Sequence, residues 1–77
     1  MASVDITTYD NDDQLVSVWC EDRHYIILLT DDDALPIELL RKAAAAAASA
    51  STKELAKAAF QAVIDEDGRF EPLISMI

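Results

Sequence analysis

Carboxylates are the side chains whose type and spacing point most clearly to chemistry, because they gather in three short segments of the first half of the chain. Residues 1–33 contain nine acids and one base, so one minus nine places −8 of the net charge of −9 in this half. Clustered like charges repel, and a small soluble domain needs a smaller net charge than this. The segregation therefore predicts an acidic surface that meets a positively charged partner. The acids of the three segments are Asp10, Asp12, Asp13, Glu21, Asp22, Asp31, Asp32 and Asp33.

A specific calcium site is the first alternative use of these acids. Asp10, Asp12 and Gln14 occupy positions 1, 3 and 5 of a twelve-residue calcium loop, and Glu21 falls at position 12. Position 6 must be glycine for the sharp turn, and here it is Leu15. We therefore expect no metal site, and no cofactor.

Cysteine–histidine chemistry is the second alternative. Cys20 and His24 flank a hairpin, but a two-residue turn at residues 22–23 would pair Cys20 with Tyr25 and Glu21 with His24. The cysteine would also lie on the apolar face of its strand, where a thiol is inert. The only glycine lies near the C-terminal end, so no glycine-rich phosphate loop exists. An enzyme is not expected.

Three strands are predicted to position the acidic segments. Residues 3–9 and 14–21 alternate in polarity, which is typical of half-buried strands. Residues 24–30 form a third strand whose continuous apolar run predicts burial on both faces and a central position. Successive strands run in opposite directions, so segments 10–13 and 31–33 should share one end of the sheet. Segment 21–22 should lie at the other end.

Two helices are predicted to follow. Asp33 is a good N-cap for the first helix, with Pro36 in the first turn. A capping box of Ser51 and Glu54 begins the second helix, which ends at Gly68. The apolar positions of these helices, expected to face the sheet, are Leu35, Ile37, Leu39, Leu40, Ala43, Leu55, Ala56, Ala59, Phe60, Ala62, Val63 and Ile64.

Residues 73–77 are too apolar for a loose tail and predict a fourth strand beside the third, or an arm exchanged with a second copy. The expected fold is a single α+β domain over residues 1–77. A small antiparallel sheet would be covered on one face by two antiparallel helices, in the order βββααβ.

Two further segments could contact a partner. Trp19 lies on the more polar face of its strand and is a candidate aromatic contact for a protein partner. The alanine run 43–48 favours a tight helix–helix contact within the monomer, and a close-packed homodimer seam is the alternative.

Composition restricts the partners and the compartment. The chain is 52% apolar, which excludes a disordered acidic tail. Net charge −9 argues against direct binding to nucleic acid or to an anionic membrane. A single cysteine excludes an internal disulfide, and with no apparent signal peptide or membrane span a cytoplasmic setting is expected.

In size, charge and layout, the chain resembles the small acidic anti-defence proteins of phages, including anti-CRISPR and DNA-mimic inhibitors. The resemblance implies a non-enzymatic inhibitor whose acidic surface occupies a basic, nucleic-acid-binding surface of a target protein. It covers general character only and assigns no site residues. The alternative is a small homo-oligomeric assembly or accessory module whose acids serve solubility.

Overall fold

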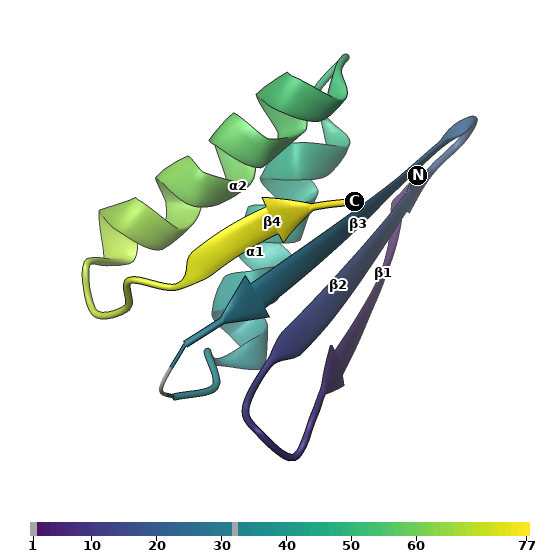
Figure 1. The fold of residues 1–77 in the computed structure, drawn as a ribbon. Coiled ribbons are helices and arrows are strands. Elements are labelled where there is room, and N and C mark those ends of the chain that lie inside the picture. Colours follow the sequence, from purple (N-terminus) through teal and green to yellow (C-terminus); the bar gives the residue numbers. More distant parts are fainter. Residues whose placement is uncertain (1, 32) are drawn as a thin grey trace.

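The computed structural model describes residues 2–31 and 33–77. Its elements follow in the order β1 (Ala2–Thr8), β2 (Gln14–Cys20), β3 (Arg23–Thr30), α1 (Ile37–Ala48), α2 (Lys53–Asp67) and β4 (Leu73–Met76). The two helices form a hairpin that covers one face of the sheet (Figure 1). This arrangement confirms the predicted α+β class and the order βββααβ.

The four strands form one antiparallel sheet in the order β1-β2-β3-β4. The last strand returns from the helices to pair with β3, with Thr30 opposite Leu73 and Ile27 opposite Met76. The predicted fourth strand is therefore confirmed within the same chain, and β3 is an internal strand.

The core lies between the sheet and the helices. Val16, Val18, Ile27 and Leu29 face the helices from β2 and β3, and all are buried together with Phe60 of α2. Within residues 2–31 and 33–77, no layer covers the opposite face of the sheet (Figure 1). The prediction that β3 is buried on both faces is consequently wrong, because its outward-facing side chains are only half-buried.

The alanine run lies in a close contact within the monomer, where α1 packs against α2 and the sheet. Ala43, Ala44 and Ala47 of α1 are completely buried, as is Ala56 of α2. Their methyl side chains let the backbones approach closely, as predicted for a contact within the monomer. Three positions of the predicted apolar stripes are instead exposed, namely Ile37, Leu55 and Ala62.

Both predicted helix starts are too early, by three residues for α1 and by one residue for α2. Asp33 does not cap α1, whose N-cap is Pro36 with no side-chain hydrogen bond. The N-cap of α2 is Thr52, whose Oγ1 accepts from the Leu55 N–H at 3.2 Å, so the box of Ser51 and Glu54 does not form. The predicted end of α2 is confirmed, since Gly68 adopts the left-handed conformation with φ 74°.

Candidate functional site

The strand register brings two acidic segments to one end of the sheet, as predicted. Gln14, which follows the first segment, lies opposite Leu29, which precedes the second. Figure 1 shows the β1–β2 turn and the β3–α1 connection at the same end. Asp32 lies outside the described residues. We call the remaining acids of these two segments the acidic end: Asp10, Asp12, Asp13, Asp31 and Asp33.

Backbone and amide contacts fix the β1–β2 turn. The Asp12 N–H donates to the Tyr9 carbonyl at 3.0 Å, and the Tyr9 N–H donates to the Asp13 carbonyl at 2.8 Å. Asn11 accepts from the Asp13 N–H at 3.2 Å and donates to the Asp13 carboxylate at 3.0 Å. Asp12 has φ 68°, a left-handed conformation that aspartate and asparagine tolerate. These bonds fix the backbone of the turn from which its carboxylates project, and one of them holds the Asp13 carboxylate itself.

A buried glutamine joins the turn to the second acidic segment. The Gln14 side chain is 1% exposed, and its Oε1 accepts from the Leu35 N–H at 2.8 Å. Its Nε2 donates to the Leu35 carbonyl at 3.1 Å and to Thr8 Oγ1 at 3.2 Å. These bonds hold the β3–α1 connection against the start of β2. An Asp33 side chain acting as N-cap would accept from the N–H of residue 35 or 36. The Leu35 N–H already donates to Gln14 and Pro36 has no N–H, so neither is available to such a cap.

The role of Gln14 was missed from the sequence, although a signal for it was present. Gln14 occupies the same inward-facing side of β2 as Val16, Val18 and Cys20. A polar side chain at such a position must find hydrogen-bond partners inside the protein. Its partner is the backbone of a segment distant in sequence, and no local pattern identifies that segment.

Further acids reach the same end of the sheet from α2, and these were also not predicted. Asp65, Glu66 and Asp67 lie at the helix C-terminus, where the macrodipole is negative and the last turn has no basic residue. The connection after them leads to β4, which starts opposite the last residue of β3. Carboxylates at this position oppose the dipole, so they increase the negative potential there.

One cation partly neutralises this helix end. Arg69 Nε and Nη2 donate to the two carboxylate oxygens of Asp67 at 2.7 and 3.1 Å. The hydrogen bond from Arg69 is the main cause that lowers the pKa of Asp67 below its ordinary value of 3.8. The guanidinium also lies 5.3 Å from the centre of the Phe70 ring.

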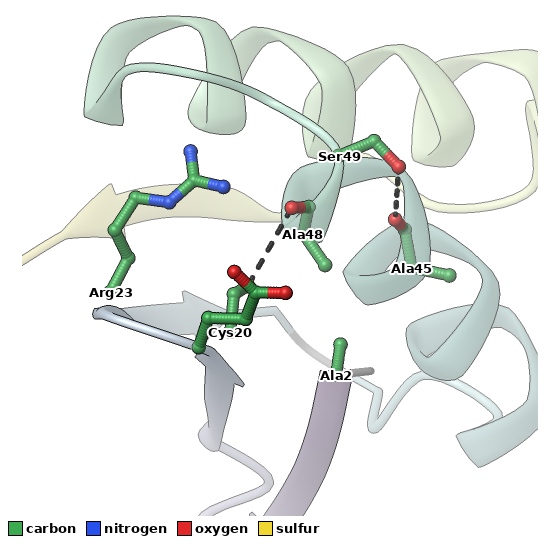
Figure 2. Close-up of a pocket in the computed structure, with 7 residues that line it drawn as sticks. Ala2, Cys20, Arg23, Ala45, Ala48 and Ser49 are labelled. Carbon is green, nitrogen blue, oxygen red and sulfur yellow. Dashed lines mark hydrogen bonds between the residues drawn. The ribbon is translucent and has the colours of Figure 1, made fainter.

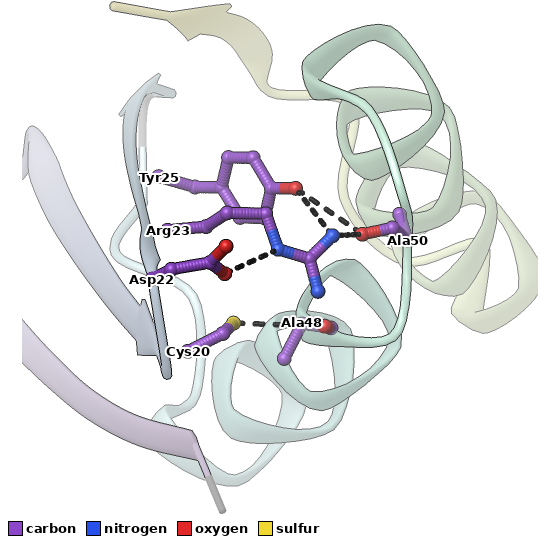
Figure 3. Close-up of polar contacts among 6 residues, drawn as sticks. All are labelled: Cys20, Asp22, Arg23, Tyr25, Ala48 and Ala50. Atoms are coloured by element: carbon purple, nitrogen blue, oxygen red, sulfur yellow. Dashed lines mark hydrogen bonds and ion pairs between the residues drawn. The ribbon is translucent and has the colours of Figure 1, made fainter.

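Glu21 and Asp22 lie at the opposite end of the sheet, which we call the hairpin end (residues 20–25). The two-residue turn is Glu21-Asp22, and Cys20 pairs with Arg23. The predicted pairings of Cys20 with Tyr25 and of Glu21 with His24 are therefore wrong. The observed register is favoured because it turns Arg23 toward the helices, where its Nη1 donates to the Ala50 carbonyl (Figure 3).

Other polar groups of the hairpin end are also used internally. The Tyr25 hydroxyl donates to the Ala50 carbonyl at 3.2 Å, and the Cys20 thiol donates to the Ala48 carbonyl at 3.5 Å (Figure 3). Arg23 Nε lies 3.7 Å from the Asp22 carboxylate. These contacts attach the hairpin to the linker between the helices.

A pocket of about 370 Å³ opens beside this attachment (Figure 2). The end of α1 contributes carbonyl groups, of which Ala48 accepts from the Cys20 thiol and Ala45 accepts from the Ser49 hydroxyl. Arg23 is the only cation in its lining and is engaged elsewhere. The lining thus brings together the Glu21 carboxylate, the Arg23 guanidinium and a buried Cys20 thiol that is bonded to the Ala48 carbonyl.

Trp19 lies away from the acidic end, on the uncovered face of the sheet near the hairpin end. It is 53% exposed and stacks on His24, with ring centroids 3.5 Å apart and an interplanar angle of 9°. This cross-strand pair separates the imidazole from the Cys20 thiol, which faces the helices. The structure thus gathers Asp10, Asp12, Asp13, Asp31 and Asp33, and separates them from Trp19, Glu21 and Asp22.

Within residues 2–31 and 33–77, no group of three or more His, Cys, Asp or Glu side chains is arranged to hold a metal ion. No helix in this described part is long and apolar enough to span a bilayer. Comparison with protein-family models, with curated proteins and with solved structures finds no match for this chain.

Proposed function

We propose that this protein is a non-enzymatic inhibitor whose acidic end occupies a basic, nucleic-acid-binding surface of a target protein. The observation that carries the proposal is how the acidic end is built. Neutral amides build it: the Asn11 amide fixes the first acidic segment, and the Gln14 amide joins this segment to the backbone of Leu35, just after the second. The carboxylates of Asp10, Asp12 and Asp33 make no ion pair or hydrogen bond within the described part of the chain.

Such an arrangement offers negative charge at fixed positions, comparable in character to a stretch of phosphates. Because the backbone that carries these carboxylates is already ordered, little backbone entropy is lost when they pair with lysine or arginine of a partner. The negative end of α2 adds to the potential and steers a cationic partner toward this end. Bound there, the protein excludes nucleic acid from the same surface.

The proposed partner is a basic nucleic-acid-binding protein or complex in the cytoplasm, contacted without direct binding to nucleic acid or membrane. An anti-defence role of the phage type, which the resemblance in size and charge implies, belongs to the same proposal. The chemistry requires only that the target normally hold phosphates with clustered cations.

The test is capture of partners from nuclease-treated cytosolic lysate at low and at moderate salt, followed by identification of the captured proteins. We expect a nucleic-acid-handling protein that binds at low salt and is lost as salt rises, because exposed charge pairs are screened. Capture that is indifferent to salt, or of proteins without a basic surface, would contradict the proposal.

The alternative, a homo-oligomeric assembly or accessory module, has less support. The small side chains of Ala43, Ala44 and Ala47 are buried within the monomer. The strand that could have been exchanged pairs with β3 of its own chain. Sedimentation of the purified protein at low and moderate salt distinguishes the two functions, since an assembly module forms stable oligomers at both.

A further inference from the structure

We infer that the uncovered face of the sheet is a second contact surface, and that it binds a partner protein surface with an apolar centre and cationic margins. This inference rests on the proposed function, because the partner is the same basic protein. We call this surface the open face. Strand alternation and register assign to it Ser3, Asp5, Thr7, Leu15, Ser17, Trp19, His24, Ile26, Leu28, Thr30, Leu73, Ser75 and Ile77.

The composition of the open face differs from that of an ordinary solvated sheet face. Only Asp5 of its thirteen residues is an acid or a lysine or arginine, although such residues make up 27% of the chain, which would give about three. Depletion of charge is typical of the centre of a protein interface. A face without a covering layer is normally polar in an antiparallel sheet.

The apolar residues of the open face are contiguous. Ile26 and Leu28 of β3 lie at its centre and are half-buried by their neighbours. Leu73 and Ile77 extend the patch across the β4 edge and are 70% and 65% exposed. Ile77 is fixed there by its N–H, which donates to the Ile26 carbonyl at 2.9 Å. A contiguous patch of this kind marks an interaction site, whereas single exposed apolar residues do not.

The charges around the open face determine which kind of partner can bind to it. The acidic end bounds it on one side, and Glu21 and Asp22 bound it on the other. Any face-to-face packing of two copies would bring acids against acids, because Arg23 is turned inward toward the Ala50 carbonyl and does not compensate. Repulsion between two chains of net charge −9 disfavours a second copy. A partner with cations on both margins is complementary instead.

The length of the strands gives the spacing of those cations. The seven residues of β2 at 3.3 Å per residue separate the two acidic margins by about 23 Å. A helix of about 16 residues, which rises 1.5 Å per residue, spans this distance with lysines in its first and last turns. The open face is therefore complementary to a helix that has aliphatic side chains along one side and cations at both ends.

The experiment uses two synthetic peptides and the single tryptophan as a reporter. The first peptide is an amphipathic helix of about 16 residues, with leucines along one face and lysines in both terminal turns. The second has the same lysines, but glutamine replaces each leucine. We expect the leucine peptide to bind at least tenfold more tightly at low ionic strength and to shift the emission of Trp19.

Matched variants assign the binding to the open face. L73D/I77D places two carboxylates on it, whereas I37D/L55D places two on exposed positions of the helices. We expect the first pair to weaken binding of the leucine peptide at least tenfold and the second pair to leave it unchanged. Circular dichroism checks that both variants are folded.

Three outcomes would overturn the inference, and they separate it from the proposed function. Equal binding of both peptides without a Trp19 shift removes the open face as a contact surface and leaves the acidic end as the binding site. A sedimenting dimer lost in L73D/I77D makes a second copy the occupant. Failure of both peptides to bind at low salt contradicts the proposed function as well.

Discussion

The acidic end and the hairpin end use their polar groups in opposite ways. At the hairpin end, the charged Arg23 and the Tyr25 hydroxyl are bonded to the linker between the helices. At the acidic end, the internal bonds come from the neutral amides of Asn11 and Gln14. Both ends lie on hairpins of the same sheet, so the fold alone does not impose the difference. It indicates that the hairpin end stabilises the protein and that the acidic end is available to a partner.

Removal of the Gln14 amide should have the greatest effect on stability. In Q14L the N–H and the carbonyl of Leu35 lose their buried partner, which should cost about 3 kcal/mol of unfolding free energy. Urea unfolding measures this loss. Gln61 provides the control, since its amide bonds only an exposed carboxylate, and Q61L should change stability by less than about 0.5 kcal/mol. Equal losses would refute the special role of Gln14.

Neutralisation of the two ends should separate binding from stability. D10N/D12N/D33N removes three charges from the acidic end, and E21Q/D22N/E54Q removes three from the opposite end of the molecule. We expect the first variant to bind the captured target at least tenfold more weakly, about 1.4 kcal/mol. The second removes only the two acids at the far margin of the open face and should weaken binding by no more than about threefold. Binding titrations at one salt concentration measure both.

The substitutions at the acidic end keep the local structure, which makes the comparison interpretable. Asparagine tolerates the left-handed conformation of Asp12, and Asp33 does not cap α1. We therefore expect D10N/D12N/D33N to unfold at nearly the same denaturant concentration as the wild type. E21Q/D22N/E54Q loses the Asp22–Arg23 ion pair and the acid in the first turn of α2, so its folded fraction is checked before binding is compared. Equal binding by the two variants would mean that net charge alone, and not its position, determines the interaction.

Loss of Arg23 should affect the hairpin end alone. R23M removes the hydrogen bond to the Ala50 carbonyl and the weak ion pair with Asp22, at a cost of about 1 kcal/mol because the side chain is one-third exposed. Thermal unfolding detects this loss. Target binding in the same variant should not weaken, and a tenfold loss would show that the hairpin end participates in recognition.

The smallest effect should come from the pair of Arg69 and Asp67. The pKa of Asp67 is lowered in the folded state, chiefly by the hydrogen bond from Arg69, so the pair stabilises the protein above the ordinary pKa of 3.8. This contribution is lost as the pH falls through the lowered pKa. The difference in stability between wild type and R69M should therefore be present at neutral pH and vanish in acid. A pH-independent difference would contradict the assignment.

The sequence allowed most of the fold to be predicted, because local patterns determine it. Alternation of polarity in the strands, alanine propensity in α1 and the glycine at the end of α2 act over a few residues. The return of residues 73–77 beside β3 was predicted because that segment is apolar and needs burial. The shared position of segments 10–13 and 31–33 followed from the strand directions alone.

The errors arose where distant residues decide between local alternatives. Asp33 is a favourable cap, yet Gln14 bonds the backbone of Leu35 and delays the helix to Ile37. Ser51 and Thr52 are adjacent caps of similar quality, and local sequence does not choose between them. The hairpin register depends on the contact of Arg23 with the linker between the helices. The exposure of the open face depends on which face of the sheet the helices cover, and the local sequence does not determine this.

Competition with nucleic acid tests the central claim most directly. The captured target is saturated with this protein, and its DNA or RNA is then titrated in while both bound species are measured. We expect mutual exclusion, with displacement in either direction and much weaker competition by D10N/D12N/D33N. A stable ternary complex of target, nucleic acid and this protein would contradict the claim that the acidic end occupies the nucleic-acid-binding surface.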